Sequence, residues 1–133
     1  MITGLAHICF TVSNLEESIE FYKDKLGLSP VFDFRNDKDE MTGIYLHIGG
    51  RSFIELFKSN PEKPDQKQSY KHFCLEVDDI QSTADNLRKN GVEVTEVKMG
   101  SDHSWQAWLA DPDGNRIELH QYTSDSKQNA GLK

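Results

Sequence analysis

Apolar and polar residues alternate at the start of the chain, and the same alternation returns at residues 70–80. A two-residue period is typical of a β-strand that buries one face. After each segment, apolar residues follow at helical spacing, and a glycine ends each helical pattern, Gly27 in the first case and Gly91 in the second. Asn14 is the expected N-cap of the first helix, and Asp78 or Asp79 that of the second.

The two strand-helix segments are copies of one unit. When LAHICFTVSNL (5–15) is aligned with YKHFCLEVDDI (70–80), His7 falls on His72 and Cys9 falls on Cys74. Further along, FIEL (53–56) matches RIEL (116–119), with a shift that changes by only a few residues. A nearly constant shift over such a distance indicates a duplicated unit with slightly different loops.

Each unit continues with three short strand-like runs, so the chain is predicted to be α+β, with two βαβββ modules. The expected strands are 28–34, 42–48, 51–57, 92–98, 104–110 and 116–122. Gly49-Gly50 and Asp111-Pro112-Asp113-Gly114 have the composition of tight turns. The predicted modules are 1–57 and 70–122, joined by a polar, proline-containing linker at 58–69 and followed by a frayed, flexible tail at 123–133. Together they make one domain.

One histidine and one glutamate recur at matching strand positions of the two modules. These are His7 and Glu55 in the first module, and His72 and Glu118 in the second. Glu55 and Glu118 lie within the largely apolar strand segments FIEL and RIEL, where burying a glutamate is costly unless its charge is compensated. A divalent cation held by two carboxylates and two imidazoles would compensate the charges of both glutamates. The alternative is that the histidines are structural and that Glu118 pairs with Arg116.

Cysteine and tryptophan side chains are further candidates for a site. Cys9 and Cys74 each follow a histidine by two residues on the same face, where a thiol can act as a soft ligand or as a small buried hydrophobe. Trp105 and Trp108, beside Asp102 and His103, could line the mouth of a substrate site. Strand alternation places the two tryptophans on different faces, so at least one is expected to pack in the core.

Composition excludes several function classes. The chain has 133 residues and a net charge of −7, which disfavours binding to nucleic acid or to an acidic membrane surface. Two cysteines do not make a disulfide framework, and no apolar run reaches the ~20 residues that span a bilayer. The start, MITGLAHICF, lacks the pattern of a secretory leader. The expectation is a cytoplasmic protein that acts on a small molecule.

Two segments, AHICFTVSNLEESIEFYKDKLGL and DPDGNRIEL, resemble the vicinal-oxygen-chelate superfamily, and the resemblance extends over about residues 2–122. This superfamily includes glyoxalase I, methylmalonyl-CoA epimerase, extradiol dioxygenases, and the fosfomycin and bleomycin resistance proteins. The resemblance implies a cup-shaped mixed sheet around a metal ion, with His7, Glu55, His72 and Glu118 as ligands. This set looks most like glyoxalase I. The dioxygenases and fosfomycin enzymes use three protein ligands, and the epimerase has Gln at the position of Glu55.

The resemblance also implies a reaction, the isomerisation of a 2-oxoaldehyde–thiol hemithioacetal to a 2-hydroxyacyl thioester. Glu118 is the expected base and Glu55 its counterpart, with Ni, Co, Zn or Mn as the metal and a thiol such as glutathione as cosubstrate. Thr11 stands where glutathione-dependent members carry Arg, and Ser59 where they carry Asn. Four residues are candidates for substrate contact: Thr11, His103, Trp105 and Arg116.

Other readings of the same resemblance stay open. One is a different metal-dependent enzyme of the superfamily, either an epimerase or a transferase of the fosfomycin resistance type. Another is a binding protein of the bleomycin type, without metal or turnover. Because each module leaves a sheet edge and half a cup, a homodimer is expected, and the four ligands can come from one chain or from two.

Overall fold

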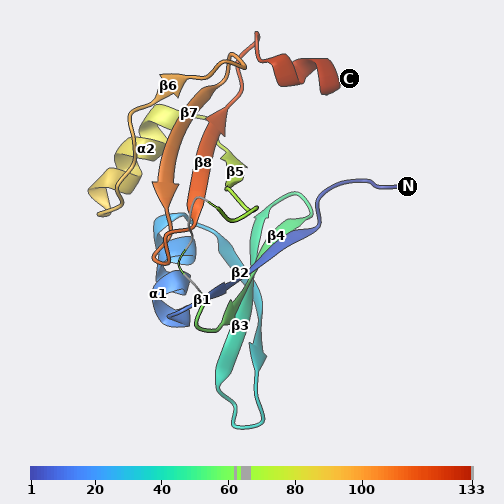
Figure 1. The fold of residues 1–133 in the computed structure, drawn as a ribbon, viewed down its shortest axis with the longest axis vertical. Coiled ribbons are helices and arrows are strands. Elements are labelled where there is room, and N and C mark those ends of the chain that lie inside the picture. Colours follow the sequence, from blue (N-terminus) through green and yellow to red (C-terminus); the bar gives the residue numbers. More distant parts are fainter. Residues whose placement is uncertain (62, 64–66, 133) are drawn as a thin grey trace. The chain divides into compact units, whose positions relative to one another are not determined.

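The computed structural model describes residues 1–61, 63 and 67–132, and the chain separates into two compact units, Met1–Lys63 and Pro64–Lys133 (Figure 1). In the first unit, strand β1 (His7–Val12) leads to helix α1 (Leu15–Ile19), which continues as a π-helical segment over Glu20–Lys25. Three strands follow: β2 (Ser29–Arg35), β3 (Met41–Gly49) and β4 (Ser52–Lys58). They form a sheet in the order β1-β4-β3-β2, in which only β1 and β4 are parallel.

The second unit repeats this arrangement. Strand β5 (Phe73–Glu76) and helix α2 (Ile80–Lys89) precede β6 (Lys98–Met99), β7 (Trp105–Ala110) and β8 (Arg116–Gln121). The strand order is β5-β8-β7-β6, and β5 is parallel to β8. The predicted α+β fold with two βαβββ modules is therefore confirmed. The predicted linker, 58–69, includes residues 62 and 64–66, which lie outside the described residues.

The helices begin and end where the sequence predicts. The Asn14 side chain accepts a hydrogen bond of 3.0 Å from the Glu17 amide, and the Asp79 side chain accepts one of the same length from Ser82. These caps satisfy amide groups that the first helical turn leaves without partners. Gly27 and Gly91 follow the two helices at φ 77° and 81°, a backbone conformation that glycine adopts without steric cost. None of the helices in the described residues is long and apolar enough to cross a membrane.

Each sheet buries one face, and the other face carries polar side chains together with aromatic ones. The buried apolar residues of the strands are Val12, Ile44, Leu46, Ile54 and Leu56 in the first unit, and Phe73, Leu75, Ala107, Leu109, Ile117 and Leu119 in the second. In the second unit, α2 lies against the sheet at β7 and β8 and contributes Ile80, Ala84 and Leu87 (Figure 1). Alternation along β4 and β8 then places Glu55 and Glu118 on the opposite face.

The strand predicted at 92–98 is wrong for most of its length, because only Lys98–Met99 pair with β7. The guanidinium of Arg88, from α2, donates hydrogen bonds to the carbonyl oxygens of Val94 and Thr95, at 3.3 and 2.8 Å. The Thr95 hydroxyl in turn accepts the Trp108 amide at 2.9 Å. The Thr95 amide still donates to the Trp108 carbonyl at 2.9 Å, but the Arg88 side chain occupies the carbonyl oxygens of Val94 and Thr95, so regular strand pairing does not continue there.

The C-terminal segment also differs from the expectation of a frayed tail. Residues Lys127–Gly131 form a short 3₁₀-helix, and Ser126 before it is buried. The Ser126 hydroxyl lies 2.7 Å from that of Ser104, and Gln128 donates a hydrogen bond to the Asp102 carboxylate. The segment has no hydrophobic pattern of its own. Its order comes from polar groups of the β6–β7 loop, which a reading of local periodicity does not detect.

Candidate metal centre

The first His–Glu pair is built on the parallel strands β1 and β4. Cys9 lies directly opposite Glu55 in the ladder, which places His7, two residues earlier, on the same face. The His7 Nε2 atom is 4.0 Å from Glu55 Oε1. The Glu55 side chain is 17% exposed, and its strand neighbours Ile54 and Leu56 are fully buried on the other face. The packing of these neighbours orients the carboxylate towards His7.

The second pair repeats this geometry on β5 and β8. Cys74 lies opposite Glu118, and His72, the residue immediately before β5, places its Nε2 atom 3.1 Å from Glu118 Oε2. The Glu118 side chain is 13% exposed, and Ile117 and Leu119 beside it are buried in the core. The register that joins Cys9 to Glu55 and Cys74 to Glu118 is the same in both modules. The repeat found in the sequence is thus a repeat of side-chain geometry.

Arginine does not compensate either carboxylate. The guanidinium of Arg116 lies over the Trp108 ring, 4.4 Å from its centroid. In the described part of the chain, the cationic partners of Glu55 and Glu118 are histidines alone. Largely buried carboxylates beside imidazole nitrogens form a donor set that suits a divalent transition metal. Each pair is therefore chemically suited to hold a metal ion.

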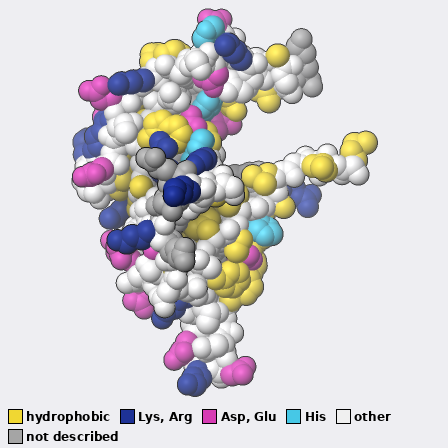
Figure 2. All heavy atoms as spheres, viewed as in Figure 1, with side chains coloured by type: hydrophobic (Ala, Val, Ile, Leu, Met, Phe, Trp, Pro, Cys, Tyr) yellow, Lys and Arg dark blue, Asp and Glu magenta, His cyan; other side chains and the backbone are white. Residues whose placement is uncertain are grey.

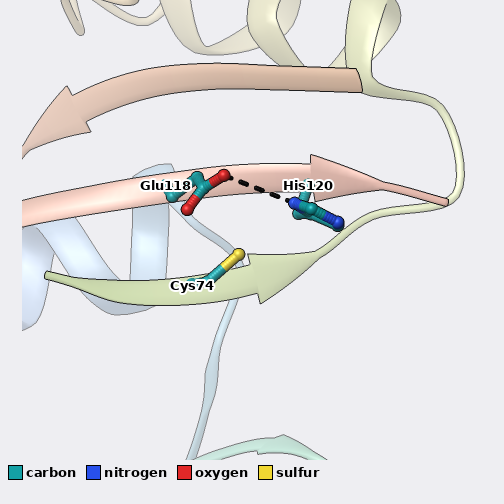
Figure 3. A group of neighbouring side chains, drawn as sticks. All are labelled: Cys74, Glu118 and His120. Atoms are coloured by element: carbon teal, nitrogen blue, oxygen red, sulfur yellow. Dashed lines mark hydrogen bonds and ion pairs between the residues drawn. The ribbon is translucent and has the colours of Figure 1, made fainter. Parts of the chain in front are cut away.

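A third histidine contacts Glu118 in the second unit. His120 Nδ1 lies 3.3 Å from Glu118 Oε1 (Figure 3). Because Oε2 faces His72, the two carboxylate oxygens face different histidines. His120 is 7% exposed and lies two residues after Glu118 on β8. The corresponding residue after Glu55 is Phe57. Sequence reasoning assigned no role to His120, although its two-residue spacing from Glu118 predicts that they share a face.

The two cysteines lie beside the carboxylates as protonated thiols. Desolvation raises the pKa of Cys9 to about 11, and the adjacent Glu55 contributes through a hydrogen bond and its charge. Desolvation and the Glu118 charge raise the pKa of Cys74 to about 12. Both residues remain exposed to solvent. Neither is thus a free thiolate nucleophile at neutral pH, because the thiolate form is the reactive one.

Aromatic rings surround the first His–Glu pair. Tyr45 lies opposite Glu55 in the β3–β4 ladder, and its ring centroid is 5.5 Å from that of His7. Phe32 stacks on Tyr45 with 4.7 Å between centroids, and Phe53 adds a tilted contact at 5.4 Å. Figure 2 shows a group of neighbouring hydrophobic side chains on the first unit. The pair thus adjoins an apolar surface able to contact an organic ligand.

The structure separates the predicted substrate-contacting residues. Thr11 is exposed on β1, on the same face as His7, and Arg116 reaches the second pair through Trp108, whose ring lies 4.7 Å from that of His72. Trp105 is 37% exposed and lies on the other face of β7, and His103 is in the β6–β7 turn at φ 65°. These two are not beside His72 or Glu118.

The expectation that one tryptophan packs in the core is wrong. Trp105 is exposed, and Trp108 is half-buried on the face that carries Glu118, which it opposes in the ladder. Trp108 also lines a hollow of about 440 Å³ together with Thr95, Glu96, Lys98 and Gln106. Trp108, rather than Trp105, is the tryptophan near the candidate centre. The register between β7 and β8 determines which tryptophan lies opposite Glu118, and alternation within β7 alone does not predict that register.

Comparison with known proteins places these features in a family. The profile of the Glyoxalase/Bleomycin resistance protein/Dioxygenase superfamily matches residues 4–119. A protein of Staphylococcus haemolyticus named metallothiol transferase FosB is 31% identical over 126 residues, which cover 90% of this chain and 84% of that protein. A lactoylglutathione lyase of Haemophilus influenzae is 32% identical over 123 residues, or 86% of this chain and 90% of that protein.

Solved structures agree on the fold. The crystal structure of SMU.1112c has a TM-score of 0.81 at 24% identity and covers 90% of this chain and 99% of its own. TnmS3, an antibiotic binding protein from Streptomyces sp. CB03234, has a TM-score of 0.75 at 25% identity and covers 92% and 98%. The set of similar proteins therefore contains enzymes with different names and a binding protein, so similarity alone does not assign a reaction to this chain.

Proposed function

The chain belongs to the Glyoxalase/Bleomycin resistance protein/Dioxygenase superfamily, and we propose that it is a metal-dependent lyase of the glyoxalase I type. The proposed substrate is the hemithioacetal of a 2-oxoaldehyde and a thiol, and the product is a 2-hydroxyacyl thioester. The observation that carries this proposal is the repetition of one His–Glu pair, in the same register, in both modules. The repeated pattern includes both Glu55 and Glu118, as the four-ligand set of the glyoxalase I type requires.

The proposed ligands are His7, Glu55, His72 and Glu118, which together would hold one divalent cation. Two imidazoles and two carboxylates suit Ni, Co, Zn or Mn, and the affinity order of these ions does not by itself choose one of them. When bound, the ion supplies Lewis acidity to two adjacent substrate oxygens. The site then requires a base that moves one proton between neighbouring carbon atoms.

Glu118 is the proposed base. Its carboxylate takes the proton from the hemithioacetal carbon and returns it to the adjacent carbonyl carbon. The hydroxyl proton passes to the former carbonyl oxygen, so the isomerisation needs no external oxidant or reductant. The contact of His120 Nδ1 with Glu118 Oε1 fixes the orientation of the carboxylate while Oε2 faces His72. Glu55 has only His7 as its ion-pair partner among the described residues and is proposed as the counterpart that remains a ligand.

Thr11 and Arg116 are the proposed contacts to the thiol part of the substrate. Thr11 is exposed on the face of β1 that carries His7 and offers a hydroxyl group. Arg116 offers a guanidinium positioned over Trp108, suited to a carboxylate of the thiol cosubstrate. The aromatic group of Phe32, Tyr45 and Phe53 would contact the carbon chain of the aldehyde and exclude water from the reacting atoms.

An assay with methylglyoxal and a panel of thiols, including glutathione, tests this proposal. Protein loaded with Ni²⁺, Co²⁺, Zn²⁺ or Mn²⁺ is expected to form thioester with at least one thiol. Chelation should abolish thioester formation, and return of the ion should restore it, because the ligands then regain their Lewis acid. A metal-loaded protein that forms no thioester with any thiol would exclude the lyase.

The second candidate is a thiol transferase that opens an epoxide antibiotic, and the similarity to FosB proteins favours it. Fosfomycin consumption in the presence of thiol distinguishes the two activities. Glu55→Gln separates them further, because the proposed lyase uses four protein ligands whereas the fosfomycin enzymes use three. The variant should therefore lose the lyase activity but retain the transferase. Binding of ligand without turnover, the alternative suggested by the exposed aromatic face, would appear as a negative result in both assays.

A further inference from the structure

The polar face of the second unit carries a group of potential metal ligands that differs from the His–Glu pairs. The Cys74 sulfur, a carboxylate oxygen of Glu118 and a ring nitrogen of His120 all lie within 4.8 Å of one another (Figure 3). Cys74 and Glu118 are opposite each other in the β5–β8 ladder, and His120 follows Glu118 by two residues. Regular strand geometry therefore directs all three side chains to one side of the sheet.

The ring of His120 lies between two carboxylates, those of Glu118 and Asp102. Its side chain is 9% exposed, with Nδ1 facing Glu118 and Nε2 lying 3.7 Å from Asp102 Oδ2. Nε2 is buried and has no hydrogen-bond partner among the described residues. Metal-bound histidines commonly direct the second ring nitrogen to a carboxylate, which fixes the tautomer. Asp102 is itself held in place by Gln128 and by the Ser104 amide.

We propose that Cys74, Glu118 and His120 form a second metal site, selective for thiophilic cations such as Zn²⁺ and Cd²⁺. Thiolate, imidazole and carboxylate are the three donor types that zinc uses in proteins, and an open fourth position would hold water. Cys74 is exposed, so an ion reaches it from solvent. When the sulfur–metal bond forms, the thiol proton leaves to solvent, and the charge of the ion replaces it.

The first unit provides an internal comparison. Cys9 and Glu55 have the same register as Cys74 and Glu118, but Phe57 occupies the position that corresponds to His120. Its ring lies against Phe34, with 4.9 Å between centroids, and offers no nitrogen. The first unit therefore has two of the three donor types at this position. The proposed site should form at Cys74 and not at Cys9.

Glu118 links this site to the proposed lyase. One of its carboxylate oxygens lies 3.1 Å from His72 and the other 3.3 Å from His120. A thiophilic ion held by Cys74 would therefore bind the Glu118 carboxylate, which the four-ligand centre also needs. Inhibition by excess Zn²⁺ or Cd²⁺ follows from this sharing and rests on the proposed function. The site itself does not, because its three ligands belong to one module.

Titration of the metal-free full-length protein with Cd²⁺ tests the site through the ultraviolet charge-transfer absorption of a cadmium–thiolate bond. One ion per chain is expected to produce the band. Cys74→Ser should abolish it, whereas the matched variant Cys9→Ser should retain it, with circular dichroism confirming that both are folded. His7→Ala should also retain the band, since His7 belongs to the other unit, and this separates the result from the fate of the proposed lyase.

The contribution of His120 is tested by His120→Gln, which is expected to weaken Cd²⁺ binding by at least about tenfold. Because His120 is buried, alkylation of the unmodified protein provides a measurement that needs no variant. Bound Cd²⁺ should slow the alkylation of Cys74 and leave the alkylation rate of Cys9 unchanged, as measured by mass spectrometry. The proposal would be overturned if the band were absent, if it persisted in Cys74→Ser, or if it were lost in His7→Ala. It would also be overturned by equal Cd²⁺ affinity in folded His120→Gln, or by protection of Cys9 instead of Cys74.

Discussion

Glu118→Gln is expected to lower thioester formation by about 10³-fold while leaving the fold intact. An amide does not accept the proton that the reaction moves, and loss of a positioned general base costs on the order of 10²–10⁴ in rate. The amide is also the weaker ligand. Glutamine has nearly the same shape as glutamate, and the described partners of this carboxylate are the polar residues His72, His120 and Cys74. The hydrophobic packing of β8 should therefore survive.

The measurement is steady-state turnover at a known metal content per chain, beside a circular dichroism spectrum. Glu93→Gln is the matched control, because Glu93 is exposed and follows α2 in a segment without regular strand pairing. It should retain the turnover of the unaltered protein. Turnover by Glu118→Gln at the unaltered level would remove Glu118 from the mechanism.

Leu119→Ala is expected to have the opposite effect, a large loss of stability with the donor atoms of the site left in place. Leu119 is the next residue on β8 but points to the other face, where it is 1% exposed and the sheet contacts α2. Truncation of a buried leucine removes its burial energy and leaves a cavity, at a cost of ~2–5 kcal/mol. For a protein of this size, that corresponds to a fall of more than about 1 M in the urea midpoint.

Unfolding of the metal-free protein measures this effect without a contribution from bound ion. Glu118→Gln serves as the neighbouring comparison and should shift the free energy of unfolding by less than about 1 kcal/mol, as expected for a side chain outside the apolar core. If Leu119→Ala were as stable as the unaltered protein, the assignment of the buried face of β8 would be wrong. The two variants together test the alternation on which the site depends.

Local sequence signals were sufficient for the parts of the fold that local forces determine. The caps at Asn14 and Asp79 and the glycines at 27 and 91 set the helix limits, because each satisfies backbone groups within its own turn. The internal repeat then predicted that the second sheet would copy the first. Strand order and register agree with that prediction in both modules.

Features that depend on distant partners could not be predicted in this way. The strand expected before β6 is interrupted by the guanidinium of Arg88, a residue of the preceding helix. The C-terminal segment is ordered by polar groups of the β6–β7 loop and not by its own pattern. The hydrophobic pattern of neither segment predicts these contacts, because each is a hydrogen bond made by a polar side chain and does not depend on apolar spacing.

The candidate site was predictable to the extent that the repeat marks it. The sequence placed each histidine near its glutamate, and the structure brings His7 to Glu55 and His72 to Glu118. It named Trp108 without preferring it to Trp105, and it assigned no role to His120, whose counterpart in the first module is Phe57. Their positions follow from the β7–β8 register and from Asp102 in a loop. Where the modules differ, duplication provides no signal.

Metal content per chain tests whether the two repeated His–Glu pairs hold one ion together. The protein is prepared in the Cys74→Ser background, so that no thiolate at Cys74 can hold an ion, and is equilibrated in turn with Ni²⁺, Co²⁺, Zn²⁺ and Mn²⁺ before elemental analysis. One ion per chain is expected, and it should be lost both in His7→Ala and in His72→Ala. Two ions per chain, with one retained in each histidine variant, would show that the pairs act separately. No bound ion under any condition would contradict the metal centre itself.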